Sequence, residues 1–114
     1  MRTIIAGSRG IWQYELVEKA VVNSGFLVSV VISGTANGVD KLGEKYAIDH
    51  AIPLERYPAD WDAYGKSAGY RRNQQMAEVA DALIAVTNGS KGTQHMIDIA
   101  TAGGLKVYVL DVRK

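Results

Sequence analysis

Short runs of aliphatic residues recur along the chain, and they constrain its fold more than any other feature. Most of these runs are nearly continuous rather than alternating between apolar and polar residues. Strands that are buried on both faces have this pattern, which is typical of a parallel sheet covered by helices. Five runs predict five strands, at Thr3–Ala6, Leu27–Ile32, Leu54–Tyr57, Ala82–Val86 and Lys106–Leu110.

Segments with helical periodicity separate these runs, and their apolar residues gather on one side of a 3.6-residue repeat. The predicted helices are Tyr14–Ser24, Asp40–His50, Arg72–Ala80 and Thr93–Ala102, and Pro58–Gly69 is expected to be irregular. Right-handed crossovers arrange such an alternating chain as a doubly wound sheet. We therefore predict an α/β fold: a single Rossmann-like three-layer domain over residues 1–114, with a five-stranded, mainly parallel sheet and helices on both faces.

The charge balance and the missing cysteines exclude several classes of protein. Thirteen basic and 12 acidic residues give a formal net charge of +1, too little for a general attraction to nucleic acid or an anionic membrane. The chain has no cysteine, which excludes disulfides and thiolate metal sites, and no apolar run approaches the roughly 20 residues of a membrane span. We expect a cytoplasmic protein, of a bacterium or an infected host cell, without cofactor, metal, membrane or nucleic-acid partner.

Glycine-rich turns follow three of the predicted strands. They are Gly7–Gly10 after the first strand, Gly34–Gly38 after the second and Gly89–Gly92 after the fourth. Because the carboxyl ends of parallel strands meet at one edge, these turns are expected to converge where open α/β sheets bind ligands. Glycine allows a close approach of the backbone, and free N–H groups at helix starts attract phosphate. The pattern is neither the dinucleotide G-x-G-x-x-G motif nor a Walker loop.

Hydroxyl, amide and basic side chains near these turns complete the predicted site. Arg9, Lys91 and Arg72 add positive charge for a phosphate, and Asp40 is a candidate to contact a ribose hydroxyl or an amine. The candidate ligand- and phosphate-binding residues are Gly7, Ser8, Arg9, Ser33, Gly34, Thr35, Asp40, Arg72, Asn73, Gly89, Ser90, Lys91, Gly92 and Thr93. Trp61 and Trp12 are candidates to stack on a base, with core packing as the alternative.

Several of these residues also have a purely structural interpretation. Asp40 stands where a helix begins, so it is equally an N-cap or first-turn acid, and Thr93 suits both an N-cap and a phosphate ligand. Arg9 suits a surface salt bridge as well as a phosphate clamp. His50 and His95 have no partner at metal-ligand spacing and are interpreted as structural.

Four ordered motifs resemble the SLOG superfamily, which joins DNA-processing protein A (Smf) and the Lonely Guy phosphoribohydrolases. They are GSRG at 7–10, SGTANGVD at 33–40, RRNQQM at 71–76 and NGSKGTQHMI at 88–97. The PADW at 58–61 and YGKSAG at 64–69 resemble its YspA/YpsA-related branch in particular. The resemblance spans essentially the whole chain and implies a Rossmann-like sheet with a nucleotide-derived ligand at its carboxyl edge.

The resemblance also frames the choice between binding and catalysis. Lonely Guy enzymes hydrolyse the N-glycosidic bond of nucleoside monophosphates, but the position of their motif glutamate is Met96 here, and their upstream arginine matches Arg72. Other relatives sense cyclic ADP-ribose-like signals. We therefore expect a small-molecule nucleotide binder, a dimer or tetramer as in its relatives, which sequesters such a signal in the manner of a phage counter-defence protein. The alternatives are an N-glycosidic hydrolase using Asp40, Asp60 or Glu44, and single-stranded DNA binding, which the charge balance argues against.

Overall fold

Five strands, all paired in parallel, form the centre of the protein, whose computed structural model describes residues 1–113. The strands are β1 (Arg2–Gly7), β2 (Val30–Ser33), β3 (Leu54–Arg56), β4 (Ala82–Thr87) and β5 (Lys106–Asp111). Their order in the sheet is β3-β2-β1-β4-β5. The predicted α/β, Rossmann-like fold is confirmed, and the sheet is wholly rather than mainly parallel.

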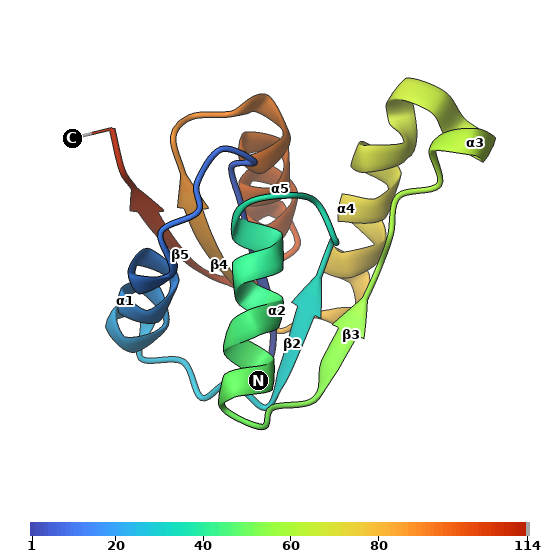
Figure 1. Cartoon of the computed structure of the whole chain (residues 1–114). Coiled ribbons are helices and arrows are strands. Elements are labelled where there is room, and N and C mark those ends of the chain that lie inside the picture. The colour runs from blue at the N-terminus through green and yellow to red at the C-terminus, as the bar shows by residue number, and fades with distance from the viewer. Residues whose placement is uncertain (114) are drawn as a thin grey trace.

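Helices cover both faces of this sheet. They are α1 (Tyr14–Ser24), α2 (Val39–Asp49), α3 (Trp61–Tyr64), the 3-10 turn η1 (Gly65–Ser67), α4 (Ala68–Val79) and α5 (Lys91–Ala102). The helices α1 and α2 lie on one face, and α4 and α5 on the other, while α3 and η1 extend away from the body (Figure 1).

The alternation of side chains along the central strands divides the core in two. Ile5 and Ile84 point toward α1 and α2, and their neighbours Ile4 and Leu83 point toward α4 and α5. All four are fully buried, which is why the central strands are continuously aliphatic. The helices of both layers thus pack against the sheet that carries the loops at its carboxyl edge.

The topology places a crevice beside β1. The chain adds β2 and β3 on one side of β1 and then crosses to the other side to form β4 and β5. Right-handed crossovers in opposite directions put the connecting helices on opposite faces. The loops that leave β1 and β4 therefore diverge to opposite faces, which opens the crevice where ligands bind in such sheets.

Three predicted element starts differ from the structure by two residues or more. The second strand begins at Val30 rather than Leu27, whose side chain is 83% exposed. The stretch predicted as irregular, 58–69, contains α3 and η1, and α4 begins at Ala68, four residues before the predicted start at Arg72. The last helix begins at Lys91 rather than Thr93. The polar sequence around α4 lacks the apolar repeat on which the prediction depended.

Candidate functional site

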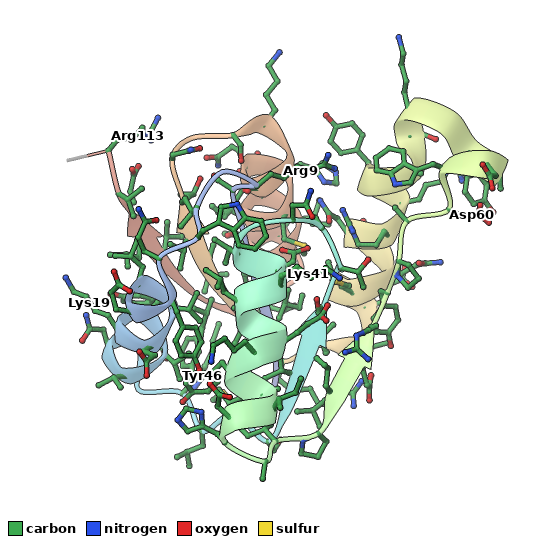
Figure 2. The ribbon with its side chains drawn as sticks, viewed as in Figure 1. Arg9, Lys19, Lys41, Tyr46, Asp60 and Arg113 are labelled. Carbon is green, nitrogen blue, oxygen red and sulfur yellow. The ribbon has the colours of Figure 1, made fainter. Side chains whose placement is uncertain are left out.

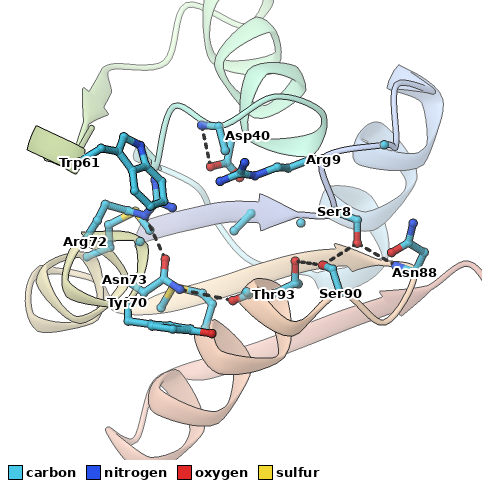
Figure 3. A pocket seen from close by; sticks show the side chains of 18 of the residues that line it. Ser8, Arg9, Asp40, Trp61, Tyr70, Arg72, Asn73, Asn88, Ser90 and Thr93 are labelled. Atoms are coloured by element: carbon cyan, nitrogen blue, oxygen red, sulfur yellow. Dashed lines mark hydrogen bonds between the residues drawn. The ribbon is translucent and has the colours of Figure 1, made fainter. Parts of the chain in front are cut away.

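A cavity of about 460 Å³ opens at the carboxyl ends of β1 and β4, between α2, α4 and α5 (Figure 3). This is the point where the strand order reverses. The glycine turns after β1 and β4 both contribute to its wall, whereas the third predicted turn, Gly34–Gly38, contributes only Ala36. The lining residues are Ala6, Gly7, Ser8, Arg9, Gly10, Ala36, Asp40, Trp61, Lys66, Gly69, Tyr70, Arg72, Asn73, Met76, Asn88, Ser90, Gly92, Thr93 and Met96.

The turn after β1 is held tightly against the turn after β4. The backbone N–H of Ser8 donates to the carbonyl of Val86, and the Ser8 hydroxyl accepts from the N–H of Asn88. A Cβ on Gly7 would lie 2.0 Å from the Val86 carbonyl oxygen, so only glycine fits there. Arg9 follows on the exposed rim at the carboxyl end of the sheet (Figure 2), and its side chain extends toward Asp40 (Figure 3).

A row of hydroxyl groups leads from this turn to the start of α5. The hydroxyls of Ser8 and Ser90 are 3.0 Å apart, and Ser90 donates to the Thr93 hydroxyl at 2.8 Å (Figure 3). Ser90 is the N-cap, yet its side chain accepts no backbone hydrogen bond. Within residues 1–113 nothing accepts from the N–H groups of Lys91, Gly92 and Thr93. The positive end of the helix therefore stands uncapped at the cavity wall.

The expectation that Thr93 caps this helix is wrong. Thr93 lies within the first turn, and Ser90 occupies the cap position three residues earlier. The side chain of Thr93 is buried and lines the cavity through its place in the hydroxyl row.

Arg72 is a charged side chain of the cavity that is only 9% exposed. Its Nη1 donates to the carbonyl of Gly34, and its Nε donates to Oδ1 of Asn73 at 3.0 Å. Within residues 1–113 no carboxylate lies within 4 Å of it, and no acceptor contacts Nη2. Burial lowers the pKa of the guanidinium, and the positive charge of Arg9 lowers it further, while Asp40 opposes both.

The sequence predicted that a helix begins at Arg72, and this is wrong. It lies in the second turn of α4, beyond the first turn in which the helix dipole acts most strongly. What distinguishes Arg72 is its burial: the charge of Asp40 offsets only part of the desolvation, so the pKa of the guanidinium stays below its ordinary value.

Asp40 lies opposite, in the first turn of α2, and is 4% exposed. One of its oxygens accepts from the N–H of Ala36 at 3.2 Å. Burial raises the pKa of its carboxyl group to about 6, although Arg72 and the N–H groups of Ala36 and Gly7 oppose the rise.

Asp40 is a first-turn acid rather than the N-cap. The cap is Gly38, at φ 77°, where a Cβ would lie 2.4 Å from the Ser8 carbonyl oxygen. Asp40, two residues later, lines the cavity.

Asn73 links the arginine to α5. Its Oδ1 accepts from Arg72, and its Nδ2 donates to the carbonyl of Gly92 at 3.3 Å. The same Nδ2 lies 3.2 Å from Nδ1 of His95. Asn73 is buried, so these bonds fix both the arginine and the start of α5.

Apolar and aromatic side chains complete the cavity. The side chains of Met76 and Met96 are each 1% exposed, so both are core residues that also form part of the lining. Trp61, 50% exposed, and Tyr70 stand at the rim beside Arg72 (Figure 3). This combination of a polar wall and aromatic rim suits a ligand with a charged group and a flat ring.

Ten of the predicted residues line the cavity: Gly7, Ser8, Arg9, Asp40, Trp61, Arg72, Asn73, Ser90, Gly92 and Thr93. The structure does not place Ser33, Gly34, Thr35, Gly89, Lys91 or Trp12 in the lining. The Ser33 hydroxyl donates to Glu44 at 2.7 Å and so braces α2 against β2. Gly34 contributes only the carbonyl that holds Arg72.

The other three turn residues and Trp12 have different surroundings. Thr35 adopts φ 65° and donates its N–H to the Ser33 hydroxyl. Gly89 packs against the side chain of Arg113, and Lys91 is exposed outside the cavity. Trp12, 54% exposed, lies in the loop between β1 and α1.

Sequence reasoning missed several lining residues, chiefly Lys66, Tyr70 and Asn88. Asn88 directly precedes the glycine turn Gly89–Gly92, and this position could have identified it as a site residue. Lys66 and Tyr70 lie in the segment predicted as irregular or at its end, and only the start of α4 at Ala68 brings them to the cavity.

Two of the three candidate catalytic acids lie away from the cavity. Asp60 caps α3 by accepting from the N–H of Ala63, far out on the extended segment (Figure 2). Glu44 is committed to Ser33 and to an ion pair with Arg56 at 3.0 Å. Asp40 is the one of the three that lines the cavity.

Two negative findings hold for residues 1–113. No three His, Asp or Glu side chains gather closely enough there to hold a metal ion. No helix in that range is long and apolar enough to cross a membrane.

Comparison with known proteins agrees with this architecture. The sequence profile of the YspA, cpYpsA-related SLOG family matches residues 1–64. Over 118 aligned residues the chain is 30% identical to the Gene 61 protein of Mycobacterium phage D29, covering 93% of each chain. No solved structure matches. The chain belongs to the YspA, cpYpsA-related SLOG family, and this membership indicates nucleotide-related binding or processing.

Proposed function

We propose that this protein binds a nucleotide-derived ligand through its phosphate and does not turn the ligand over. The observation that carries the proposal is the buried guanidinium of Arg72, which faces a cavity and has no carboxylate within 4 Å among residues 1–113. An anionic ligand would supply the missing charge through Nη2, in the charge-assisted geometry that arginine favours.

The surroundings of Arg72 suggest how the ligand lies. The uncapped start of α5, with the hydroxyls of Ser90 and Thr93, offers N–H and O–H donors to a phosphate. Asp40 offers a carboxylate to ribose hydroxyls, and Trp61 a ring for a base at the rim. In this arrangement Arg9 and Arg72 neutralise the phosphate from its two sides.

We further propose that binding serves to remove a signal such as a cyclic ADP-ribose-type nucleotide from the cytosol of an infected cell. Two observations support this role. A relative of matching length is a phage protein. The position of the Lonely Guy glutamate is Met96, a thioether that neither activates water nor donates a proton. A dimer or tetramer is part of the same proposal, as the resemblance to the SLOG superfamily implies.

The test is to incubate the purified protein with nucleoside monophosphates, ADP-ribose and cyclic ADP-ribose isomers, and to remove free ligand by gel filtration. Chromatography of the supernatant after heat denaturation then identifies what was held. Release of the intact compound supports sequestration. Retention of none of the probes would refute the proposal, and accumulation of free base would replace it by hydrolysis.

One observation favours that second function, an N-glycosidic hydrolase. Asp40 is a buried carboxyl group in the cavity with its pKa raised to about 6, a value at which it could exchange a proton with a leaving base near neutral pH. Replacing Asp40 by asparagine separates the two functions. Hydrolysis would be abolished in Asp40→Asn, whereas retention of intact ligand would only weaken, because the amide oxygen of asparagine still accepts from a ribose hydroxyl.

A further inference from the structure

We infer that His95, which lies just outside the cavity lining, is a positioning residue. As the neutral Nε2–H tautomer it accepts a hydrogen bond from Asn73 and so fixes the Asn73 side chain. Asn73 in turn accepts from the Arg72 guanidinium and orients it toward the ligand. The inference rests on the proposed function, since it concerns the arginine that would bind the phosphate. It adds a residue from α5 whose part is to orient a neighbour rather than to touch the ligand.

The directions of the hydrogen bonds follow from groups that have only one choice. An arginine Nε–H can only donate, so the atom of Asn73 that faces it is the amide oxygen. A backbone carbonyl can only accept, so the atom facing Gly92 is the amide nitrogen. Two independent partners therefore fix the orientation of the Asn73 amide.

This orientation decides the protonation of His95. The Asn73 Nδ2 that lies 3.2 Å from the imidazole Nδ1 is a donor, so Nδ1 must offer its lone pair. The ring proton then resides on Nε2, and His95 is neutral. The imidazole is also held in place by Tyr70, whose ring meets it edge-on with centroids 4.5 Å apart.

The other histidine of the chain requires the opposite tautomer. Nδ1 of His50 lies 3.0 Å from the carbonyl oxygen of Tyr46, which can only accept. His50 therefore carries a proton on Nδ1. His50 therefore serves as an internal control for His95, because the two histidines of the chain require opposite tautomers.

Protonation of His95 would put a second donor against Asn73 Nδ2 and end their hydrogen bond. The charged and titratable groups near it are Tyr70 and Arg72 on α4, and Lys91 and Asp98 one turn away on α5. A flip of the Asn73 amide toward a protonated ring would turn its NH₂ toward the Arg72 Nε–H, donor against donor. Arg72 would then lose its side-chain tether.

The first test is spectroscopic and needs no ligand. Long-range ¹H–¹⁵N correlation spectra at pH 8 distinguish the two imidazole tautomers. We expect His95 to show the Nε2–H pattern and His50 the Nδ1–H pattern. An Nδ1–H tautomer or a charged ring at His95 would overturn the inference, whatever the protein binds.

The second test measures the consequence for Arg72. His95→Phe keeps a ring against Tyr70 but removes the acceptor, and His95→Gln restores an acceptor. By titration calorimetry with AMP and ADP-ribose, we expect His95→Phe to bind roughly tenfold more weakly, the scale of one hydrogen bond that orients a charged group. His95→Gln should recover most of this loss, and the control His50→Phe should match the wild type.

The outcomes separate the two proposals. Unchanged affinity in His95→Phe, with wild-type binding intact, would refute the role of His95 alone. If the wild type binds neither these two probes nor the cyclic ADP-ribose isomers, the proposed function fails, and the Arg72 Nε–H resonance then decides the positioning role. That resonance should shift and exchange faster with solvent in His95→Phe than in His50→Phe, and an unchanged signal would refute the inference.

Discussion

Asp40 gives the sharpest prediction about stability, because it is a carboxyl group that the fold buries at a measurable cost. Its side chain is 4% exposed, and its pKa is about 6 in the folded protein against an ordinary value of 3.8. The difference is about two pH units, and each unit corresponds to about 1.4 kcal/mol. Ionised Asp40 therefore costs the folded state about 3 kcal/mol.

The sign of the pH dependence follows from which state loses its proton first. Below about pH 4 the carboxyl group is protonated in both states, and there is no cost. Between about pH 4 and 6 the unfolded chain ionises first, so folding stability falls as the pH rises. Above about pH 6 both states are ionised and the cost is constant. Asp40→Asn imitates the protonated group and removes the cost.

We therefore expect Asp40→Asn to be more stable than the wild type by up to about 3 kcal/mol at pH 7.5, with the difference shrinking toward zero near pH 4. Urea unfolding followed by circular dichroism at several pH values measures it, with Asp98→Asn on the exposed face of α5 as the control. A difference that does not vary with pH, or a wild type more stable than the variant at pH 7.5, would refute this account of the buried carboxylate.

Two matched pairs supply the remaining predictions. Gly7→Ala should lower the free energy of unfolding by about 1–3 kcal/mol, because its Cβ would meet the Val86 carbonyl, whereas Gly92→Ala, with open space around it, should raise it by up to about 1 kcal/mol. Equal effects in urea unfolding would contradict the packing of the β1 turn. Trp61→Ala should weaken nucleotide binding by about 1–3 kcal/mol, while Trp12→Ala, similarly exposed but outside the cavity, should leave it unchanged. Calorimetry decides this, and equal affinities for both variants would remove Trp61 from the site.

The parts of the fold that the sequence predicted are those encoded by local pattern. The central strands are continuous aliphatic runs in the sequence. The glycine turns after β1 and β4 are short local motifs, and both line the cavity in the structure. The start of α4 was missed because Ala68–Tyr70 has a glycine and no apolar repeat, so its helical state depends on tertiary contacts. A shift of four residues in a helix start changes which side chains face the cavity, and so Tyr70 was missed with it.

The burial of Arg72 could not be predicted from the local sequence for a related reason. Its presence in the site could be predicted from motif and position, but its burial could not. The carbonyl that holds it belongs to Gly34, on another strand end, and Asp40 approaches from a third element. Ser33 and Thr35 were assigned to the ligand for the converse reason. The Ser33 hydroxyl donates to Glu44 on α2 and accepts from the N–H of Thr35, which only the folded arrangement reveals.

Two adjacent arginines offer the most direct test of the central claim, which is that the buried guanidinium of Arg72 binds the phosphate of the ligand. Arg72 lines the cavity, whereas its neighbour Arg71 is exposed and lies over the ring of Tyr64. The measurement is the affinity of wild type, Arg72→Gln and Arg71→Gln for AMP and ADP-ribose by titration calorimetry at one salt concentration. We predict a loss of about 1.5–3 kcal/mol, roughly 10- to 150-fold, for Arg72→Gln and less than about twofold for Arg71→Gln. Equal affinities for the two variants, or a wild type that binds no phosphorylated probe, would contradict the claim.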